Sequence, residues 1–321
     1  MQLLNHKKLH IVAGRATEEL VADICRELDV VQGTPNIAEF ANGEIHVKYS
    51  DSIRGSDVFI VQTHTAWGGR SVNDSIMEHL IMVDAAKRAS AKRITAVAPF
   101  YGYSRQDRKA SGREPITARL IADLFHAAGA DRLISVDLHS GQIQGFFDIP
   151  TDNLFAAPVF IQDIKSRYQN GNLMIVSPDV GGVVRARSLA SRLDADLAII
   201  DKRRPKAGVS EVMNIIGDVD GRHCIMVDDI VDSGGTLCNA AAALIDSGAL
   251  SVDAYVTHGV LSGGAVSRVA SSPLKSLVTT DSIPATEAVR VARNIRHLSI
   301  APLLGEAIRR INEERSVSTL F

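Results

Sequence analysis

The distribution of apolar residues predicts a chain in which short strands alternate with longer helices. Short apolar runs are bounded by polar and glycine-containing segments, as is typical of buried strands. Strands are expected at residues 9–13, 45–48, 58–62, 94–98, 133–137, 173–177, 197–200, 223–227, 251–258, 276–279 and 295–299. Helices are expected at residues 17–28, 71–89, 115–128, 157–168, 180–193, 235–246, 264–271 and 302–314.

This alternation predicts an α/β architecture of mainly parallel sheets flanked by helices, because buried parallel strands are apolar along their length. The two halves have similar lengths and a similar order of elements, although no literal sequence repeat is visible. We therefore expect two similar domains, 1–150 and 151–321, joined near residues 144–157, with the C-terminal segment packing back on the first domain. Functional loops should then follow the carboxyl ends of the strands.

The composition excludes several classes of protein. A formal net charge of -2 does not provide the basic footprint of a nucleic-acid-binding protein. The three cysteines, Cys25, Cys224 and Cys238, are scattered and odd in number, which fits a reducing compartment and not a disulfide framework. The first residues lack the apolar core of a signal peptide, and no apolar stretch reaches about 18 residues. We expect a cytoplasmic protein with no nucleic-acid or membrane partner.

The most informative segment runs from Val227 to Thr236. An apolar strand leads into Asp228 and Asp229, then into a Ser-Gly-Gly turn, and an Ala-rich helix follows. Glycines let the main chain approach a phosphate, and a helix N-terminus favours an anion. The adjacent carboxylates would repel that anion unless they hold sugar hydroxyls or a metal. A ribose phosphate satisfies all three features, whereas the simpler alternative is an acidic helix cap.

Two sequence patterns separate the remaining nucleotide-binding classes. Neither GxxxxGK[ST] nor GxGxxG occurs, which argues against common NTPases and dinucleotide enzymes.

The segment 228–236 resembles the phosphoribosyl-pyrophosphate loop of type I phosphoribosyltransferases and their relatives. The run DLHSGQIQGFFDIP at 137–150 resembles the signature of class I ribose-phosphate pyrophosphokinases. The resemblance to that family extends from Phe40 to Phe321 and implies two phosphoribosyltransferase-like domains.

The resemblance also implies a reaction. Enzymes of this family transfer the β,γ-pyrophosphoryl group of MgATP to the C1 hydroxyl of ribose 5-phosphate. AMP is released, and the product, 5-phosphoribosyl 1-pyrophosphate, supplies nucleotide, histidine and tryptophan biosynthesis. Catalysis should rest mainly on positioning and charge neutralisation, since phosphoryl-type transfer needs little covalent assistance. No residue stands out as a general base for the C1 hydroxyl.

On the ATP side, the resemblance assigns an adenine-binding loop that reaches into a neighbouring subunit's site. A Phe offers a stacking face and Asn and Glu can bond a base edge, although an Asn-Gly pair is also a turn signal between strands. A second loop follows the strand at 94–98. The implied ATP-binding residues are Phe40, Asn42, Glu44, Arg105, Gln106, Asp107 and His139.

The resemblance places Mg²⁺ near His139 and Asp179. Because Mg²⁺ prefers oxygen ligands, His139 either binds the metal or positions the ATP phosphates. Backbone N–H groups at the start of the following helix would hold the transferred pyrophosphate. That pyrophosphate loop comprises Asp179, Val180, Gly181 and Gly182.

The implied catalytic loop carries Lys202 and Arg204, which would stabilise charge around the β-phosphorus. The following Lys206, Ala207 and Gly208 depart from the family pattern, but both catalytic positions are intact. On the acceptor side, Asp228 and Asp229 would take the ribose hydroxyls, directly or through a cation. The 5-phosphate would lie on Asp232, Ser233, Gly234, Gly235 and Thr236.

Regulation and assembly follow from the resemblance alone. Inorganic phosphate or ADP is expected at Ser52 and Arg54, with a second wall from Ser316, Ser318 and Thr319. A frayed, solvated tail is the alternative interpretation of those last residues. A homo-oligomer, a hexamer in the family manner, is expected because the adenine loop acts across subunits.

Two rival functions make different use of the motifs. A phosphoribosyltransferase would explain residues 228–236 but would leave 137–150 and Arg105 without a purpose. A non-catalytic regulatory homologue would be expected to have lost Lys202 or Arg204, and both are present.

Overall fold

The computed structural model describes residues 8–168, 171–203 and 212–320 and forms two compact units. Unit 1 contains the described residues of 1–155, 282–284 and 299–321. Unit 2 contains the described residues of 156–281 and 285–298. The last helix, α9 (Ala301–Asn312), therefore belongs to unit 1.

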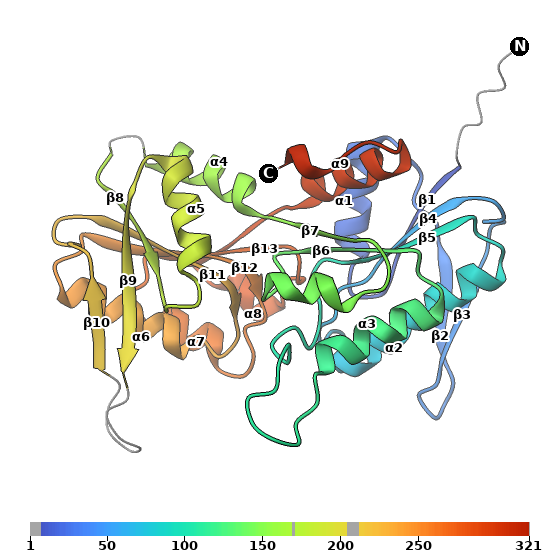
Figure 1. Cartoon of the computed structure of the whole chain (residues 1–321), viewed down its shortest axis with the longest axis horizontal. Helices are drawn as coiled ribbons and strands as arrows, with labels where there is room; N and C mark the ends of the chain where they lie inside the picture. The colour runs from blue at the N-terminus through green and yellow to red at the C-terminus, as the bar shows by residue number, and fades with distance from the viewer. Residues whose placement is uncertain (1–7, 169–170, 204–211, 321) are drawn as a thin grey trace, which may run out of the picture. The chain divides into compact units, whose positions relative to one another are not determined.

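Unit 1 is built on a five-stranded sheet with the strand order β1-β4-β5-β6-β7, and all four pairings are parallel. Helices α1 and α9 cover one face of this sheet, and α2 and α3 cover the other (Figure 1). The strands are β1 (Leu9–Ala13), β4 (Asp57–Val61), β5 (Arg93–Ala98), β6 (Arg132–Val136) and β7 (Thr151–Leu154). The helices, besides α9, are α1 (Glu18–Leu28), α2 (Val72–Arg88), α3 (Thr117–Ala128) and the 3-10 helix η1 (Gly141–Phe146).

A separate antiparallel hairpin, β2 (Pro35–Glu39) and β3 (Ile45–Tyr49), completes unit 1. Helix α2 lies against β3, and the Tyr49 hydroxyl donates to the Met82 carbonyl at 3.0 Å. Helix α2 begins at a capping box, in which the Ser71 hydroxyl accepts from Asp74 N and the Asp74 carboxylate accepts from Ser71 N. The hairpin is thus attached to a helix whose start is fixed.

Unit 2 is built on a seven-stranded sheet with the order β10-β9-β8-β11-β12-β13-β14. All pairings are parallel except that of the edge strand β10 with β9. The strands are β8 (Leu173–Ser177), β9 (Asp196–Arg203), β10 (Val212–Ile216), β11 (His223–Val231), β12 (Ser251–Gly259), β13 (Ser276–Thr280) and β14 (Ile295–Leu298). The helices are α4 (Ala157–Arg167), α5 (Val183–Leu193), α6 (Gly235–Asp246), α7 (Ala265–Ala270) and α8 (Glu287–Val291).

The predicted α/β architecture with parallel sheets is confirmed, and every predicted strand and helix has a counterpart. Three boundaries differ from the prediction by three or four residues. Strand β11 continues through both acidic residues to Val231, β9 continues to Arg203, and α5 begins at Val183 and not at Val180. Hydrogen bonding to β12 along Asp228, Ile230 and Val231 keeps the carboxylates on the strand instead of on the loop after it.

Two buried histidines form a continuous hydrogen-bonded chain inside unit 1. Gly102 N donates to His64 Nδ1 at 3.0 Å, and His64 Nε2 lies 3.1 Å from His79 Nδ1. His79 Nε2 in turn lies 3.1 Å from the Ile60 carbonyl. Because His64 Nδ1 accepts a hydrogen bond, the proton of the neutral His64 ring lies on Nε2, which donates to His79 Nδ1. The neutral His79 ring then carries its proton on Nε2 and donates to the Ile60 carbonyl. Both side chains are fully buried, and burial lowers the pKa of His64 well below its usual value and that of His79 to about 3.

This pair predicts a loss of stability in mild acid. Below about pH 6.5 the unfolded chain binds protons that the folded histidines reject, so the free energy of unfolding falls as the pH falls. Urea unfolding of wild type and a His79→Asn variant between pH 7 and 5.5 checks this. The wild-type slope should exceed the variant's by about 1 kcal/mol per pH unit, and His126→Gln, at an exposed helix position, should behave as wild type. Equal slopes in wild type and His79→Asn would refute the assignment.

Candidate active site

The predicted pyrophosphate loop and the predicted acceptor residues of unit 2 follow two neighbouring strands. Strands β8 and β11 pair in parallel at the centre of the seven-stranded sheet, so the loops after them leave from the same edge. The loop after β8 carries Asp179, and the end of β11 carries Asp228 and Asp229. A Cβ built on Gly182 would lie 4.0 Å from the Val227 carbonyl oxygen. The structure therefore brings the predicted pyrophosphate loop next to the acidic strand end.

The two carboxylates of β11 share one guanidinium. Arg185, on α5, places Nη1 3.2 Å from Asp228 Oδ1 and 3.1 Å from Asp229 Oδ1. Asp229 N also donates to Asp228 Oδ1 at 2.9 Å. Burial, followed by the adjacent charge of Asp229, raises the pKa of Asp228 to about 7, whereas Arg185 acts in the opposite direction. One proton is thus poised to leave this pair near neutral pH.

The segment after β11 has the backbone of an anion site. Gly234 is the N-cap of α6 with φ of 73°, a left-handed conformation that favours glycine. A glycine cap offers no side-chain acceptor, so the N–H groups of the first helical turn are left for a ligand. Ser233 and Thr236 are exposed. Neighbouring side chains fix the loop, because Ser262 donates to Asp232 Oδ1 and Arg268 donates to the Ser233 carbonyl.

The loop after β8 is closed by its own acidic residue. Asp179 Oδ1 accepts from Gly182 N at 2.9 Å, and Ser177 Oγ donates to the Asp179 carbonyl at 2.7 Å. Asp179, Val180 and Gly181 are exposed. A Cβ on Gly182 would approach Ser177 Oγ to 3.0 Å, which favours glycine there.

The predicted catalytic pair is described only in part. Lys202 lies on β9 opposite Met213 of β10, so its backbone belongs to the sheet and not to a loop. Arg204, Lys206, Ala207 and Gly208 lie outside the described residues.

In unit 1 the structure joins the loops that follow β5 and β6. Asp107 Oδ2 accepts from Ser140 Oγ at 2.6 Å and from Gln142 Nε2 at 2.8 Å. Ser140 directly follows His139, which is exposed. Asp107 therefore holds the Arg105 loop beside His139, a role that the sequence did not predict.

Gln106 and Arg105 occupy the outer part of the same loop. Both are exposed, and Thr117 Oγ1 donates to Gln106 Oε1 at 2.5 Å. Ala118 N donates to the Gln106 carbonyl at 3.2 Å. Contacts with the start of α3 thus fix Gln106. They also restrain the backbone next to Arg105.

The predicted adenine loop is the turn of the β2–β3 hairpin. Phe40 N donates to the Glu44 carbonyl at 2.9 Å, and Gly43, with φ of 90°, closes the turn. Asn42 Oδ1 accepts from Glu44 N at 3.2 Å. Phe40 is 57% exposed, with its ring edge-on to His46. The segment is therefore an Asn-Gly turn, as one interpretation of the sequence predicted. The same turn presents an aromatic face to solvent.

The predicted regulatory residues occupy two places in unit 1. Ser52 and Arg54 line a groove of about 640 Å³ with Lys48 and Arg88. The three tail residues are not among its lining; instead Arg310 donates to Thr319 Oγ1 and to the Ser316 carbonyl. Ser316 Oγ lies 2.7 Å from Ser318 Oγ. The tail is thus folded onto α9 by its own contacts.

Arg185, and Arg268 that donates to the Ser233 carbonyl in the predicted phosphate loop, were not among the residues predicted from the sequence. A signal for Arg185 was present, because two adjacent carboxylates on a buried strand require a cation. Helix α5 contains several arginines, and the one that pairs with these carboxylates could not be identified without knowing which face of the helix packs on the sheet.

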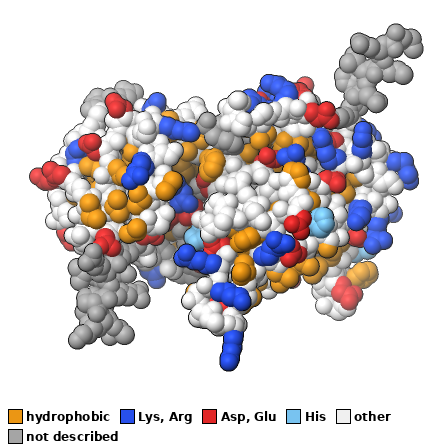
Figure 2. Space-filling model, viewed as in Figure 1, with side chains coloured by type: hydrophobic (Ala, Val, Ile, Leu, Met, Phe, Trp, Pro, Cys, Tyr) orange, Lys and Arg blue, Asp and Glu red, His pale blue; other side chains and the backbone are white. Residues whose placement is uncertain are grey.

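Charge and hydropathy of the described structure agree with the composition. Basic and acidic side chains are interspersed over the face in Figure 2, as the net charge of -2 suggests. In the described part of the chain, no helix is long and apolar enough to cross a membrane. Within the same residues, no three His, Cys, Asp or Glu side chains form a group that could hold a metal by themselves.

Comparison with known proteins gives a consistent answer along the chain. A model of the N-terminal domain of ribose phosphate pyrophosphokinase matches residues 9–129, and one of the phosphoribosyl synthetase-associated domain matches 202–321. A ribose-phosphate pyrophosphokinase of Agrobacterium fabrum is 60% identical over 313 residues, 98% of this chain and 100% of the relative. One from Hyphomonas neptunium is 60% identical over 310 residues, 96% of this chain and 97% of the relative. The crystal structure of phosphoribosylpyrophosphate synthetase from Mycobacterium smegmatis superposes with a TM-score of 0.90 at 45% identity, covering 96% of this chain and 100% of that one.

Proposed function

Because this chain belongs to the ribose-phosphate pyrophosphokinase family, which makes 5-phosphoribosyl 1-pyrophosphate from ATP and ribose 5-phosphate, we propose that its domains divide the two substrates. Residues 1–150 bind the donor ATP and residues 151–321 bind the acceptor sugar. The observation that carries this proposal is the paired strand ends in unit 2, where an anion-binding helix start follows two carboxylates. That combination suits a phosphorylated polyol.

Ribose 5-phosphate places its 5-phosphate on residues 232–236. The N–H groups of the first turn of α6 and the hydroxyls of Ser233 and Thr236 bind it, with favourable helix polarity. Asp228 and Asp229 accept from the 2- and 3-hydroxyls, and Arg185 holds both carboxylates toward one side. The C1 hydroxyl is thereby left as the nucleophile.

The C1 oxygen forms a bond to the β-phosphorus of ATP while the bond from that phosphorus to the α,β-bridging oxygen breaks. AMP leaves with that oxygen, the β,γ-pyrophosphoryl group is carried on the C1 oxygen, and the proton of the C1 hydroxyl is released to solvent. Lys202 and Arg204 stabilise the charge that develops around the β-phosphorus. The Asp179–Gly182 loop binds the transferred group through backbone N–H groups.

On the donor side, the adenine stacks on Phe40, and Asn42 and Glu44 bond its edge. Arg105, Gln106 and His139 contact the phosphates from loops that Asp107 joins. The hairpin turn serves the site of a neighbouring subunit, so the active protein is a homo-oligomer, a hexamer.

Mg²⁺ fits the residues on this chain as a partner of the ATP phosphates. Asp179 is exposed and uses Oδ1 for Gly182, which leaves Oδ2 to reach a cation. Mg²⁺ is commonly held by one or two carboxylates together with substrate phosphates, so no protein-only cluster is needed. When bound, the ion neutralises phosphate charge. His139, a nitrogen donor, is better suited to the phosphates than to this metal.

The groove beside Ser52 and Arg54 is proposed to bind inorganic phosphate or ADP as regulators, since Lys48 adds a positive charge to its lining, whereas Arg88 is paired with Asp84 there. The protein acts in the cytoplasm, where its product supplies nucleotide, histidine and tryptophan biosynthesis.

Phe40→Ala tests the donor assignment. Losing a stacking face should weaken binding of a non-hydrolysable ATP analogue by about tenfold to a hundredfold, as measured by calorimetry, and leave ribose 5-phosphate binding unchanged. Val31→Ala removes a side chain that is 92% exposed elsewhere in unit 1 and should have no effect. If Phe40→Ala bound the analogue as tightly as wild type, the adenine loop would lie elsewhere.

A further inference from the structure

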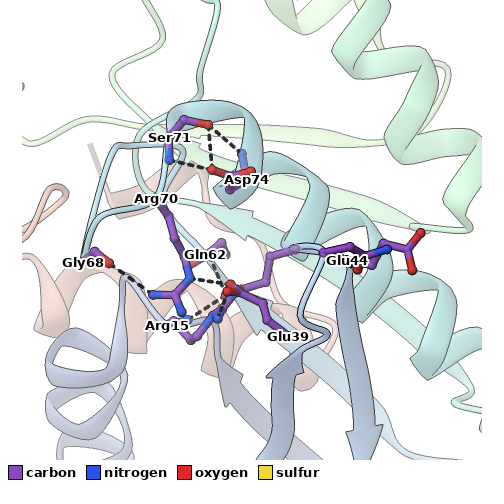
Figure 3. Close-up of polar contacts among 10 residues, drawn as sticks. Arg15, Glu39, Glu44, Gln62, Gly68, Arg70, Ser71 and Asp74 are labelled. Atoms are coloured by element: carbon purple, nitrogen blue, oxygen red, sulfur yellow. Dashed lines mark hydrogen bonds and ion pairs between the residues drawn. The ribbon is translucent and has the colours of Figure 1, made fainter.

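Glu39 lies where the hairpin meets the rest of unit 1. It is the last residue of β2, directly before Phe40. Its Oε1 lies 2.7 Å from Arg15 Nη1 and 2.6 Å from Arg70 Nε (Figure 3). Arg15 belongs to the loop after β1, and Arg70 to the loop before α2. One carboxylate thus joins the hairpin to two other segments at the edge of its exposed turn.

Arg15 is itself held by the buried carboxylate of Glu78, on α2. Its Nε lies 2.5 Å from Glu78 Oε2, and its backbone N donates to Glu78 Oε1 at 2.8 Å. The Glu78 side chain is 1% exposed and also accepts from Gln62 Nε2 at 2.8 Å. A Cβ on Gly14 would lie 2.4 Å from Gln62, so the residue before Arg15 must be small. Arg15 therefore has little freedom to follow a moving hairpin.

Arg70 is held by a tight turn. Trp67 and Arg70 exchange backbone hydrogen bonds of 3.1 and 3.0 Å across Gly68 and Gly69, both with positive φ. Ser71, the next residue, begins the capping box of α2. Arg70 Nη1 also donates to the Gly68 carbonyl at 3.4 Å. Both arginines that contact Glu39 are therefore held in place by other contacts as well.

The hairpin packs on the core of unit 1 through Ile37 and Val47, and polar contacts of two different kinds add to this packing. At its far end, Tyr49 bonds the Met82 carbonyl of α2. At the turn end the contact is ionic, and Arg70, followed by Arg15, lowers the pKa of Glu39. The side chains of Glu39 and Arg70 are both 34% exposed, so solvent reaches this pair. Exposed ion pairs contribute little to overall stability, so this one acts locally on the turn.

We propose that the Arg15–Glu39–Arg70 clamp is a positioning device for ATP recognition, which fixes the Phe40–Glu44 turn in the orientation that stacks the adenine. The inference rests on the proposed function of that turn. Glu39 needs no contact with the nucleotide, because it acts through Phe40, its neighbour in sequence. Without the clamp the turn keeps its hydrogen bonds but becomes mobile. Ordering the turn then costs part of the free energy of ATP binding, so the affinity falls.

Glu39→Gln and Arg70→Met test the clamp from its two sides. Each should raise the Kd of a non-hydrolysable ATP analogue by about tenfold and leave the Kd of ribose 5-phosphate and the kcat at saturating ATP unchanged. Arg26→Met breaks an exposed ion pair with Asp23 on α1 and should behave as wild type. Trp67 is the single tryptophan of the chain, so its emission reports directly on the turn that holds Arg70.

A double-mutant cycle with Phe40→Ala separates positioning from a general structural effect. If Glu39 acts through Phe40, adding Glu39→Gln to Phe40→Ala should cost almost nothing further in ATP affinity. A second tenfold loss in that background would overturn the clamp as a positioning device. Wild-type ATP affinity in both Glu39→Gln and Arg70→Met, with Phe40→Ala impaired, would refute the clamp alone. Wild-type affinity in Phe40→Ala would overturn the adenine loop as well.

Discussion

Replacing Lys202 by alanine is expected to lower kcat by about 10²–10³ with much smaller changes in the KM of either substrate. Lys202 is the second-last residue of β9 in the sheet of unit 2, and Arg204 follows two positions later in the sequence. In the proposed mechanism, the ammonium of Lys202 stabilises charge that develops only as the β-phosphorus is transferred. Such a contact affects the transition state more than the bound substrates, so the loss appears in kcat.

Steady-state kinetics with each substrate varied in turn provides the measurement. Lys165→Ala is the matched control, since Lys165 is an exposed residue of α4 in the same unit. An unchanged kcat in Lys202→Ala would exclude Lys202 from catalysis, and a loss confined to KM would make it a substrate-binding residue.

Asp228→Asn should raise the KM for ribose 5-phosphate by about tenfold to a hundredfold, the cost of losing a charged hydrogen-bond acceptor, and leave the KM for ATP nearly unchanged. The pH profile adds a second readout. Because the pKa of Asp228 lies at about 7, the carboxylate is protonated below that pH and ionised above it. In wild type, kcat/KM for ribose 5-phosphate should therefore rise as the pH increases through about 7, and the variant should lack that limb.

Asp246→Asn, at an exposed position at the end of α6, is the control for the loss of one negative charge in unit 2. A variant with an intact acidic limb would show that another group titrates. An increased KM for ATP in place of ribose 5-phosphate would mean that the donor and acceptor assignments had been exchanged.

Apolar patterning was sufficient for the parallel sheets because their central strands are buried on both faces. All five residues of β4 and of β8 are buried, and such runs are visible in the sequence. Strands β2 and β7 were missed because PNIAE is half exposed and TDNL has a single buried residue. Strand boundaries near Asp228 were wrong because carboxylates are uncommon in a ladder, and here the neighbouring strand and Arg185 make them acceptable.

Motifs supplied the candidate substrate-binding residues, whereas the residues that support them came only from the structure. Arg15 and Glu78 are separated by 63 positions, and neither lies in a recognisable motif. Their contact depends on how the loop after β1 meets α2, which local periodicity does not encode. Asp107 was assigned to ATP from its neighbours, but its contacts to Ser140 and Gln142 show that it joins two loops.

Phosphorus NMR of the protein with MgATP and ribose 5-phosphate, and with no nucleobase, shows whether the pyrophosphoryl group moves to the sugar. The ATP resonances should give way to AMP and to a pyrophosphate attached to C1 of the sugar. Formation of ADP with a singly phosphorylated C1 would contradict attack at the β-phosphorus. A sample that stayed unchanged until a nucleobase was added would contradict the donor and acceptor roles altogether.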